Sequence, residues 1–416
     1  MKVLHTSDWH LGHQLHQQKR DEEHRAFLEW LLQVIHEKGV ELLLVAGDIF
    51  DTALPSNHAL EMYYSFLARA AANGCREVIV VAGNHDSPAT LLAPKPVLRA
   101  IHVTVVGNIV AEQPGNDLVE IRDGQGAPQA LVCAVPHLRD RDVYRPKFGE
   151  PVEQRMTGII EGTAGWYRTL ADLALERRGA LGVPHLPLIA TGHLFTQGAT
   201  KSGSERDLYV GDLGIFPAGR FPQEFSYVAL GHLHRPQVAR GCPNVRYSGS
   251  PLPCSFDEAA YDKKVFVFAT ESPAEVEDVV VPVFRSLVRV RGDLAALGEG
   301  LEKIGPAPLK PWVEVVYEDG PPLSDLEEKV FDLAARGAGQ VLTIKDLSSP
   351  GGAIAPPPPL DELTPQQVFE LCLEQAGTRE EDRGLAREAF QRLLLQVQQG
   401  EVPEAPATGA RKGGAA

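Results

Sequence analysis

Residues 2–10 have the sequence Lys2-Val3-Leu4-His5-Thr6-Ser7-Asp8-Trp9-His10, in which a short apolar run leads directly into an aspartate and a histidine. The same order recurs four times: residues 41–46 precede Asp48, 77–82 precede Asn84 and His85, 186–190 precede His193, and 226–230 precede His232 and His234. Short apolar runs bounded by small residues are typical of buried strands. Because ligands bind at strand ends in open α/β sheets, we expect these side chains to meet in one crevice.

The side chains that follow these runs favour particular metals. Two carboxylates, one amide oxygen and four imidazoles suit Mn²⁺, Fe²⁺ or Zn²⁺ better than Ca²⁺ or Mg²⁺ alone. Such a set is too large for one tetrahedral site but suffices for two metals about 3.5–4 Å apart that share a carboxylate. Asp48, central in the series, is the candidate bridge. Any member alone is more often a turn, a cap or a structural histidine, so the prediction depends on the repetition. The predicted ligands are Asp8, His10, Asp48, Asn84, His193, His232 and His234.

These motifs, in this order, resemble those of the calcineurin-like metallophosphoesterases. Longer stretches, at residues 4–12, 192–202 and 247–251, resemble the nuclease subunits of bacterial SbcCD-type DNA-repair complexes, and only the last part of the chain matches loosely. The resemblance implies an α/β fold: a four-layer α/β/β/α sandwich with a small α/β capping domain and a C-terminal helical pair. It also implies two Mn²⁺ per chain, with Fe²⁺, Zn²⁺ or Mg²⁺ as alternatives.

The resemblance also assigns roles to individual residues. Asp8, His10, Asp48 and His234 would hold the first metal, and Asp48, Asn84, His193 and His232 the second. His85 is not needed as a ligand. We expect it to protonate the leaving 3′-oxygen or stabilise the transition state, the alternative being a brace for the neighbouring ligands. Asp86 is a candidate to orient His85. Asp51, which stands where archaeal and eukaryotic relatives carry a histidine, is the other candidate.

The implied activity is that of a Mn²⁺-dependent DNA nuclease, an exonuclease on duplex ends and an endonuclease on hairpins and single strands. It would act as the nuclease subunit of an ATP-driven repair complex. The motifs by themselves indicate only phosphoester hydrolysis, so an enzyme for phosphomonoesters or small phosphodiesters is the alternative. A catalytically dead scaffold is disfavoured because the whole ligand set and His85 are present.

Composition limits the partners and the location. The 416 residues carry a formal charge of −15, the opposite of the basic surface that binds phosphate backbones, so we expect metals or a partner to supply part of the grip on DNA. A basic stretch at Arg139, Arg141, Arg145 and Lys147 is either a solvated loop or a DNA contact. The sequence shows neither a signal peptide nor an apolar run of about 18 residues. We therefore expect a cytoplasmic protein without membrane contact.

Periodicity and composition divide the chain into parts. Residues 1–275 form the expected nuclease domain, with amphipathic helices over 22–36, 57–73 and 156–178. A strand at 265–269 is expected to complete the second sheet. Residues 276–347 form the expected capping domain, with strands at 279–291, 312–317 and 341–346 and a helix at 323–336.

The remaining residues are expected to bind a partner. Residues 348–362 are a linker rich in proline and glycine. Residues 363–400 form a predicted helix-loop-helix, with capping signals at Thr364 and Thr378 and stops at Gly377 and Gly400. The pair either packs on the capping domain or, as the resemblance implies, docks on the coiled coil of an SbcC-type ATPase. The resemblance also implies a homodimer within a heterotetramer that acts on double-stranded DNA ends and hairpins. Residues 401–416 are predicted to be disordered.

Overall fold

The computed structural model describes residues 1–147, 149–197, 199–200 and 215–348, together with six positions from 369 to 390. The chain divides into two compact units, 1–348 and 349–416. Residues 201–214, most of the predicted linker and helix-loop-helix, and the predicted disordered tail lie outside the described residues. Among the described helices, none is both long and apolar enough to cross a membrane.

The first sheet has the strand order β14-β13-β1-β4-β5-β6. Four strands run parallel, β1 (Lys2–Thr6), β4 (Leu42–Ala46), β5 (Glu77–Val81) and β6 (Val103–Val106). β13 (Lys264–Ala269) pairs antiparallel with β1, and β14 (Ser272–Val280) pairs with β13. The expectation that the strand at 265–269 completes the second sheet was therefore wrong. The side chains on both faces of β13 are buried, and burial alone does not identify the sheet that a strand joins.

The second sheet has the order β11-β12-β10-β9-β8-β7. Its parallel strands are β8 (Pro128–Cys133), β9 (Leu188–His193), β10 (Phe225–Gly231) and β12 (Val245–Tyr247). The antiparallel edges are β7 (Leu118–Arg122) and β11 (Gln237–Val238). β9 and β10 end at His193 and Gly231, so the chain leaves this sheet at the predicted ligands.

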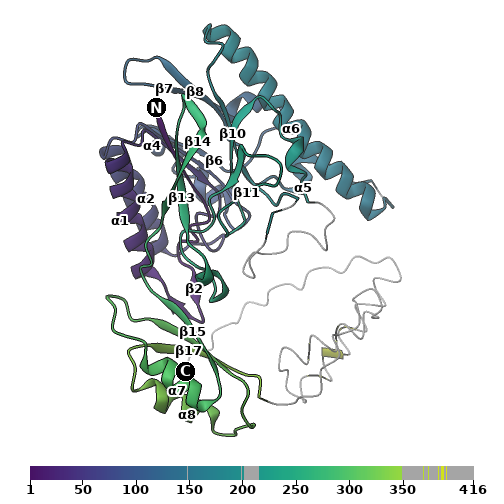
Figure 1. The fold of residues 1–416 in the computed structure, drawn as a ribbon. Coiled ribbons are helices and arrows are strands. Elements are labelled where there is room, and N and C mark those ends of the chain that lie inside the picture. Colours follow the sequence, from purple (N-terminus) through teal and green to yellow (C-terminus); the bar gives the residue numbers. More distant parts are fainter. Residues whose placement is uncertain are drawn as a thin grey trace, which may run out of the picture. The chain divides into compact units, whose positions relative to one another are not determined.

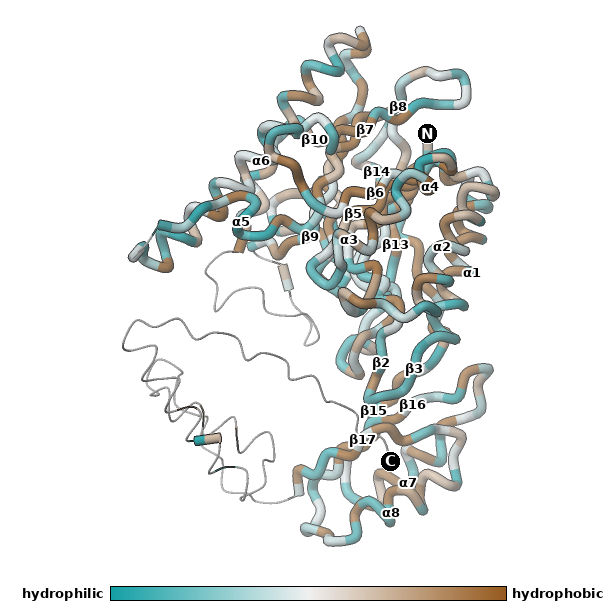
Figure 2. Tube along the Cα trace, turned by 180° about the vertical axis from the view of Figure 1, so that it is seen from behind, coloured by the Kyte–Doolittle hydropathy of each residue, from teal (hydrophilic) through white to brown (hydrophobic). Residues whose placement is uncertain are grey.

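Helices cover the outer faces of the two sheets. α1 (Asp21–Lys38) and α2 (Asn57–Ala72) pack on the first sheet, and α6 (Val152–Leu181) packs on the second (Figure 1). A separate apolar cluster lies between the sheets, with Leu44 and Val81 from one and Ile189 and Ala229 from the other. Figure 2 shows hydrophobic segments along several of the central strands. The predicted α/β/β/α sandwich is confirmed.

Shorter elements complete the sandwich. Ser56 caps α2 by accepting a hydrogen bond from the backbone N–H of Ala59 at 3.2 Å, and Gly39 ends α1 in the left-handed conformation. The remaining elements are β2 (Gln14–Leu15), β3 (Gln18–Lys19), α3 (Pro88–Leu92), α4 (Lys95–Arg99) and α5 (Asp140–Val143).

A small α/β domain follows the sandwich. Its parallel sheet has the order β15-β16-β17, made of Leu287–Gly292, Trp312–Tyr317 and Gln340–Asp346. α7 (Leu294–Glu302) and α8 (Leu326–Ala334) pack on it around a separate core. The strand expected over 279–291 is in fact two, because β14 belongs to the sandwich and residues 281–286 separate it from β15. The expected boundary between residues 275 and 276 therefore falls inside β14.

A buried cluster of charges joins the two domains. Glu23 of α1 accepts a hydrogen bond from Nε of Arg20 at 2.9 Å, and its other oxygen lies 3.2 Å from Nε of Arg285. The guanidinium of Arg285 lies 4.4 Å from the ring centre of Trp312, at the start of β16. All four side chains are buried. Because a buried charge without its partner is strongly destabilising, this cluster holds the small domain against the sandwich.

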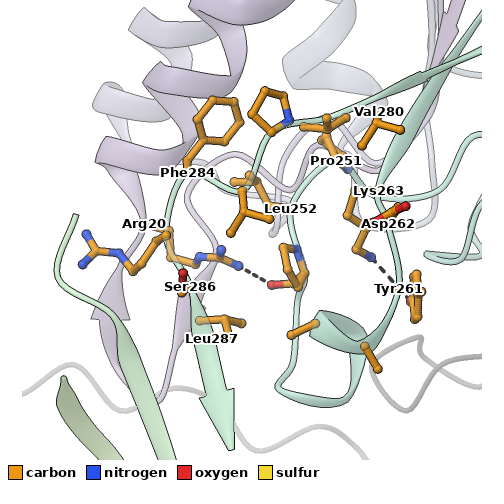
Figure 3. A pocket seen from close by; sticks show the side chains of 17 residues that line it. Arg20, Pro251, Leu252, Tyr261, Asp262, Lys263, Val280, Phe284, Ser286 and Leu287 are labelled. Carbon is orange, nitrogen blue, oxygen red and sulfur yellow. Dashed lines mark hydrogen bonds between the residues drawn. The ribbon is translucent and has the colours of Figure 1, made fainter. Parts of the chain in front are cut away.

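A cavity of about 430 Å³ lies beside this joint (Figure 3). It is lined by residues 251–253, 259–263 and 280–287 together with Arg20. None of the predicted metal ligands lines it. The cavity is therefore separate from the site that the strand ends form.

The buried carboxyl group of Asp117 makes the stability of the fold depend on pH. Its side chain is buried, and Oδ2 has no hydrogen-bond partner among the described residues. Burial raises its pKa to about 7, against the opposing charge of Lys95. The folded state holds this proton more tightly than the unfolded state does. The protonated Asp117 therefore contributes its full share of the folding stability below pH 3.8, and this contribution is lost as the pH rises through about 7. Asp117→Asn should stabilise the protein by about 1–3 kcal/mol at pH 8 and by little at pH 4.

Urea denaturation at both pH values would measure this difference, with the exposed Glu112→Gln as the matched control. A difference between Asp117→Asn and the unmodified protein that does not change with pH would contradict the prediction.

Candidate metal centre

The predicted ligands come from the carboxyl ends of parallel strands in both sheets. Asp8 and His10 follow β1, Asp48 follows β4, Asn84 and His85 follow β5, and His193 ends β9. His232 and His234 follow β10. Ligand atoms of Asp8, His10 and His234 lie within 4.8 Å of one another, as do those of Asp8, Asp48 and His193. Asn84 Oδ1 lies 2.9 Å from His193 Nε2 and 3.1 Å from His232 Nδ1. All seven predicted ligands thus meet in one site.

Backbone strain is concentrated at these positions. Four of the seven predicted ligands have a left-handed backbone: φ is 52° at Asp8, 45° at His10, 49° at Asp48 and 97° at His232. Residues other than glycine rarely adopt this backbone conformation, because it costs about 1–3 kcal/mol per residue. The strain persists because the surrounding contacts require it, and it turns each side chain inward as soon as its strand ends.

Two glycines permit the close approach of the strand ends. Gly47 has φ of 90°, and a Cβ there would overlap the ring of His193. A Cβ on Gly83 would overlap the carboxylate of Asp48. Residues without a side chain are therefore required directly before Asp48 and Asn84 for the site to close.

One group of ligands surrounds Asp8, His10 and His234. The two Nε2 atoms of His10 and His234 lie 3.2 Å apart. Nδ1 of His234 lies 3.0 Å from Oε1 of Glu258; because that carboxylate is ionised, Nδ1 carries the hydrogen and donates it. The burial of Glu258 raises its pKa, but Lys263 and His234 outweigh this effect and hold the pKa well below its usual value. Nε2 of His234 is therefore the ring atom that faces His10 across the site.

The other group surrounds Asp48. Nε2 of His193 lies 3.3 Å from Oδ2 of Asp48, while its Nδ1 donates to the backbone carbonyl of Ala46 at 2.9 Å. The carbonyl can only accept, so Nε2 is again the atom available to a metal. Oδ1 of Asp48 accepts the backbone N–H of His85 at 2.9 Å. Oδ2, which faces His193 and lies 3.7 Å from Nε2 of His10, is the atom placed between the two groups.

The donor set fits divalent cations. Carboxylate oxygens, an amide oxygen and imidazole lone pairs converge in a buried space, and such acceptors repel one another unless positive charge lies between them. Burial lowers the pKa of His193, but Asp48 outweighs it and raises the pKa to about 9. Burial also raises the pKa of Asp8. The cluster therefore requires cations, supplied either by protons or by metals, and the absence of thiolates from the seven ligands favours Mn²⁺, Fe²⁺ or Zn²⁺.

His85 lies beside these ligands with only part of its side chain accessible. Its Nδ1 donates to the backbone carbonyl of Asp51 at 2.7 Å, and its Nε2 lies 4.0 Å from Oδ2 of Asp48. Nε2 is therefore the ring atom that faces the site. Of the two predicted orienting residues, Asp51 contacts His85 through its backbone carbonyl. The Asp51 carboxylate instead lies 3.1 Å from Nδ1 of His13 and 3.5 Å from Nδ1 of His10.

The contacts of Asp86 do not match its expected role of orienting His85. Its carboxylate accepts backbone N–H groups from Ile49, Phe50 and Gly83, at 3.1, 3.0 and 2.8 Å. Burial raises the pKa of Asp86 to about 6, against these hydrogen bonds. Asp86 thus ties the loop after β4 to the loop after β5. It supports Asp48 and Asn84 by holding their backbones together.

Sequence reasoning missed the residues that orient the ligands from behind. Glu258 and Lys263 are both buried, with Nζ of Lys263 2.5 Å from Oε2 of Glu258 and 3.1 Å from the carbonyl of His234. The hydroxyl of Ser250 donates to the same carboxylate oxygen at 3.2 Å. No periodic signal links residues 234, 250, 258 and 263, so only the fold brings them together.

Comparison with known proteins identifies relatives of this arrangement. Residues 1–236 match the calcineurin-like phosphoesterase family. Residues 283–376 match the type 5 capsule protein repressor C-terminal domain family. The first match contains all seven predicted ligands and His85.

Three bacterial relatives are named as the SbcD subunit of the nuclease SbcCD. The protein of Escherichia coli K12 is 35% identical over 92% of this chain and 96% of its own length. That of Rhodobacter capsulatus is 34% identical over 89% of this chain and 93% of its own length. That of Bacillus subtilis is 30% identical over 70% of this chain and 72% of its own length.

Removing the carboxylate behind His234 should weaken metal binding. In Glu258→Gln, the side chain loses the charge that holds the hydrogen on Nδ1, and we expect a loss of Mn²⁺ affinity of about 10–100-fold. Titration calorimetry with Mn²⁺ measures it, and Glu275→Gln on the exposed edge strand β14 is the matched control. An unchanged affinity in a folded Glu258→Gln protein would show that the carboxylate does not support the ligand.

Proposed function

The chain belongs to the calcineurin-like phosphoesterases and to the family of the bacterial SbcD nuclease subunits, and from this premise we propose that it is a Mn²⁺-dependent DNA nuclease. Family membership makes it a metal-dependent phosphodiesterase. The choice of Mn²⁺, the cleavage of duplex ends as an exonuclease and of hairpins and single strands as an endonuclease, and a cytoplasmic location are parts of the proposal.

The observation that carries the proposal is the convergence of seven ligand side chains from five strand ends, with His85 beside them. Asp8, His10, Asp48 and His234 would hold one metal, and Asp48, Asn84, His193 and His232 the other. The position of Asp48 Oδ2 between the two groups supports its role as the bridge. Two metals held there would supply an activated water and would stabilise the charge that develops on a phosphate during displacement.

His85 is the proposed proton donor. With Nδ1–H committed to the Asp51 carbonyl, Nε2 can hold a proton and transfer it to the leaving 3′-oxygen. The hydrogen bond from Nδ1 to the Asp51 carbonyl sets the orientation of the ring before substrate binds. Asp51 and Asp86 support the reaction by positioning: the first through its carbonyl, the second by holding the loops after β4 and β5.

A polymeric substrate is favoured over a small phosphoester. The names of the relatives specify a nuclease, and hydrolysis of a phosphomonoester alone would not require a second domain or a C-terminal extension. The net charge of −15 supports the need for a partner that contributes to DNA binding. We propose an SbcC-type coiled-coil ATPase as this partner, with two copies of the present chain in a heterotetramer.

The C-terminal residues are proposed to dock on that partner. All six described positions beyond residue 350 are helical, and the rings of Phe369 and Phe390 stack with centres 4.0 Å apart. The two rings come from the two predicted helices, and this contact supports a helix-loop-helix over 363–400. An amphipathic helix pair of this kind docks through its apolar face.

Replacing the proposed proton donor should abolish cleavage without loss of metal. His85→Gln should lower the rate of cleavage of an end-labelled hairpin DNA in Mn²⁺ by about 10²–10⁴-fold. Its metal content, measured by mass spectrometry, should equal that of the unmodified protein. His185→Gln, in the exposed loop before β9, is the matched control. Loss of metal in His85→Gln would make His85 a brace, and failure of the unmodified protein to cut DNA while it hydrolyses a phosphomonoester would contradict the nuclease function.

Deleting the proposed docking segment should separate assembly from chemistry. A chain that ends at residue 362 should no longer co-purify with its cognate SbcC-type ATPase. Hydrolysis of bis(4-nitrophenyl) phosphate should be unchanged, because all ligands precede residue 235. Retention of the ATPase by the shortened chain would place the docking surface elsewhere.

A further inference from the structure

Several basic side chains in the described part of the chain are already paired with carboxylates. Arg20 donates to Glu23 at 2.9 Å, Lys263 to Glu258 at 2.5 Å, and Arg285 to Glu22 at 2.8 Å. Each of these charges is neutralised within the protein. In a chain with a net charge of −15, a cation at this site without a carboxylate partner is available to bind an anion.

Arg235 is such a cation. It directly follows the predicted ligand His234 and is exposed. Among the described residues, the ion pairs do not include it. Because consecutive Cα atoms lie about 3.8 Å apart, its backbone is at the rim of the metal centre.

The guanidinium of Arg235 is nevertheless held in place. It lies 5.2 Å from the ring centre of Tyr261, a cation–π contact. The backbone on either side is anchored as well: Lys263 donates to the carbonyl of His234, and Gln237 donates to that of Arg235, each at 3.1 Å. An exposed charge that is oriented before substrate binds loses little conformational freedom on binding.

We propose that Arg235 binds a backbone phosphate of the nucleic acid next to the phosphate that is cleaved. The inference rests on the proposed nuclease function. Tyr261 also lines the cavity at the joint with the small domain (Figure 3). The planar fork of arginine matches phosphate oxygens.

This contact distinguishes a polymer from a small substrate. A DNA strand that enters the metal centre carries a second phosphate to the position of Arg235, whereas a small phosphodiester has only the reacting group. Arg235 is therefore a positioning residue. It adds affinity for DNA and sets the register of the strand, and it leaves the chemistry at the metals unchanged.

The test compares two substrates across a salt series. Arg235→Gln should raise KM for cleavage of hairpin DNA about tenfold and should reduce the slope of log affinity against log salt concentration by about 1. Hydrolysis of bis(4-nitrophenyl) phosphate and Mn²⁺ content should be unchanged. Arg235→Lys, which keeps the charge, should restore the salt slope. Arg240→Gln is the matched control, since Arg240 is an exposed arginine in the turn between β11 and β12.

Three results would overturn the inference. KM and salt slope equal to those of the unmodified protein would show that no phosphate binds at Arg235, with the nuclease function intact. An equal loss on both substrates would show damage to the metal centre instead. If the unmodified protein hydrolyses bis(4-nitrophenyl) phosphate but never cuts DNA, the nuclease function itself fails, and this inference fails with it.

Discussion

The structure depends on the placement of negative charge and lone pairs in a buried space that only cations can stabilise. Asp8 and Asp48 are almost fully buried, and the imidazole nitrogens of His10, His193 and His234 face them or one another. An arrangement of this kind is unfavourable in an apolar interior unless positive charge is present. The two sheets are the reason it forms: their parallel strands end at the same place, and the strained backbones at the ligands turn the side chains inward.

The groups behind the ligands determine how the ligands can act. Ala46 and Glu258 each accept the Nδ1 hydrogen of a histidine, so that Nε2 of each ring faces the centre. Lys263 neutralises Glu258 and also holds the carbonyl of His234. Outer partners of this kind orient metal ligands and raise their basicity. A centre of fixed geometry, with His85 beside it, suits phosphoester hydrolysis.

Substrate choice is a separate matter from the chemistry. The small domain is joined to the sandwich by a buried cluster in which Glu23 faces two arginines, and its position on the sandwich is thereby set. The surface of an acidic chain has little general attraction for DNA. The proposed function therefore needs individual contacts and a partner to bind DNA. Arg235 is a local exception to the charge of the whole chain.

The sequence by itself located the predicted ligands at strand ends and indicated the main layers. Five apolar runs that end in Asp, Asn or His indicated one metal centre, and helical periodicity located α1, α2 and α6, because both signals are local. The sheet joined by β13 and the boundary inside β14 were decided by tertiary structure, since periodicity reports burial without naming the neighbour. The same holds for Glu258 behind His234 and for the backbone contacts of Asp86. These contacts join residues that are distant in sequence, and only packing in three dimensions brings them together.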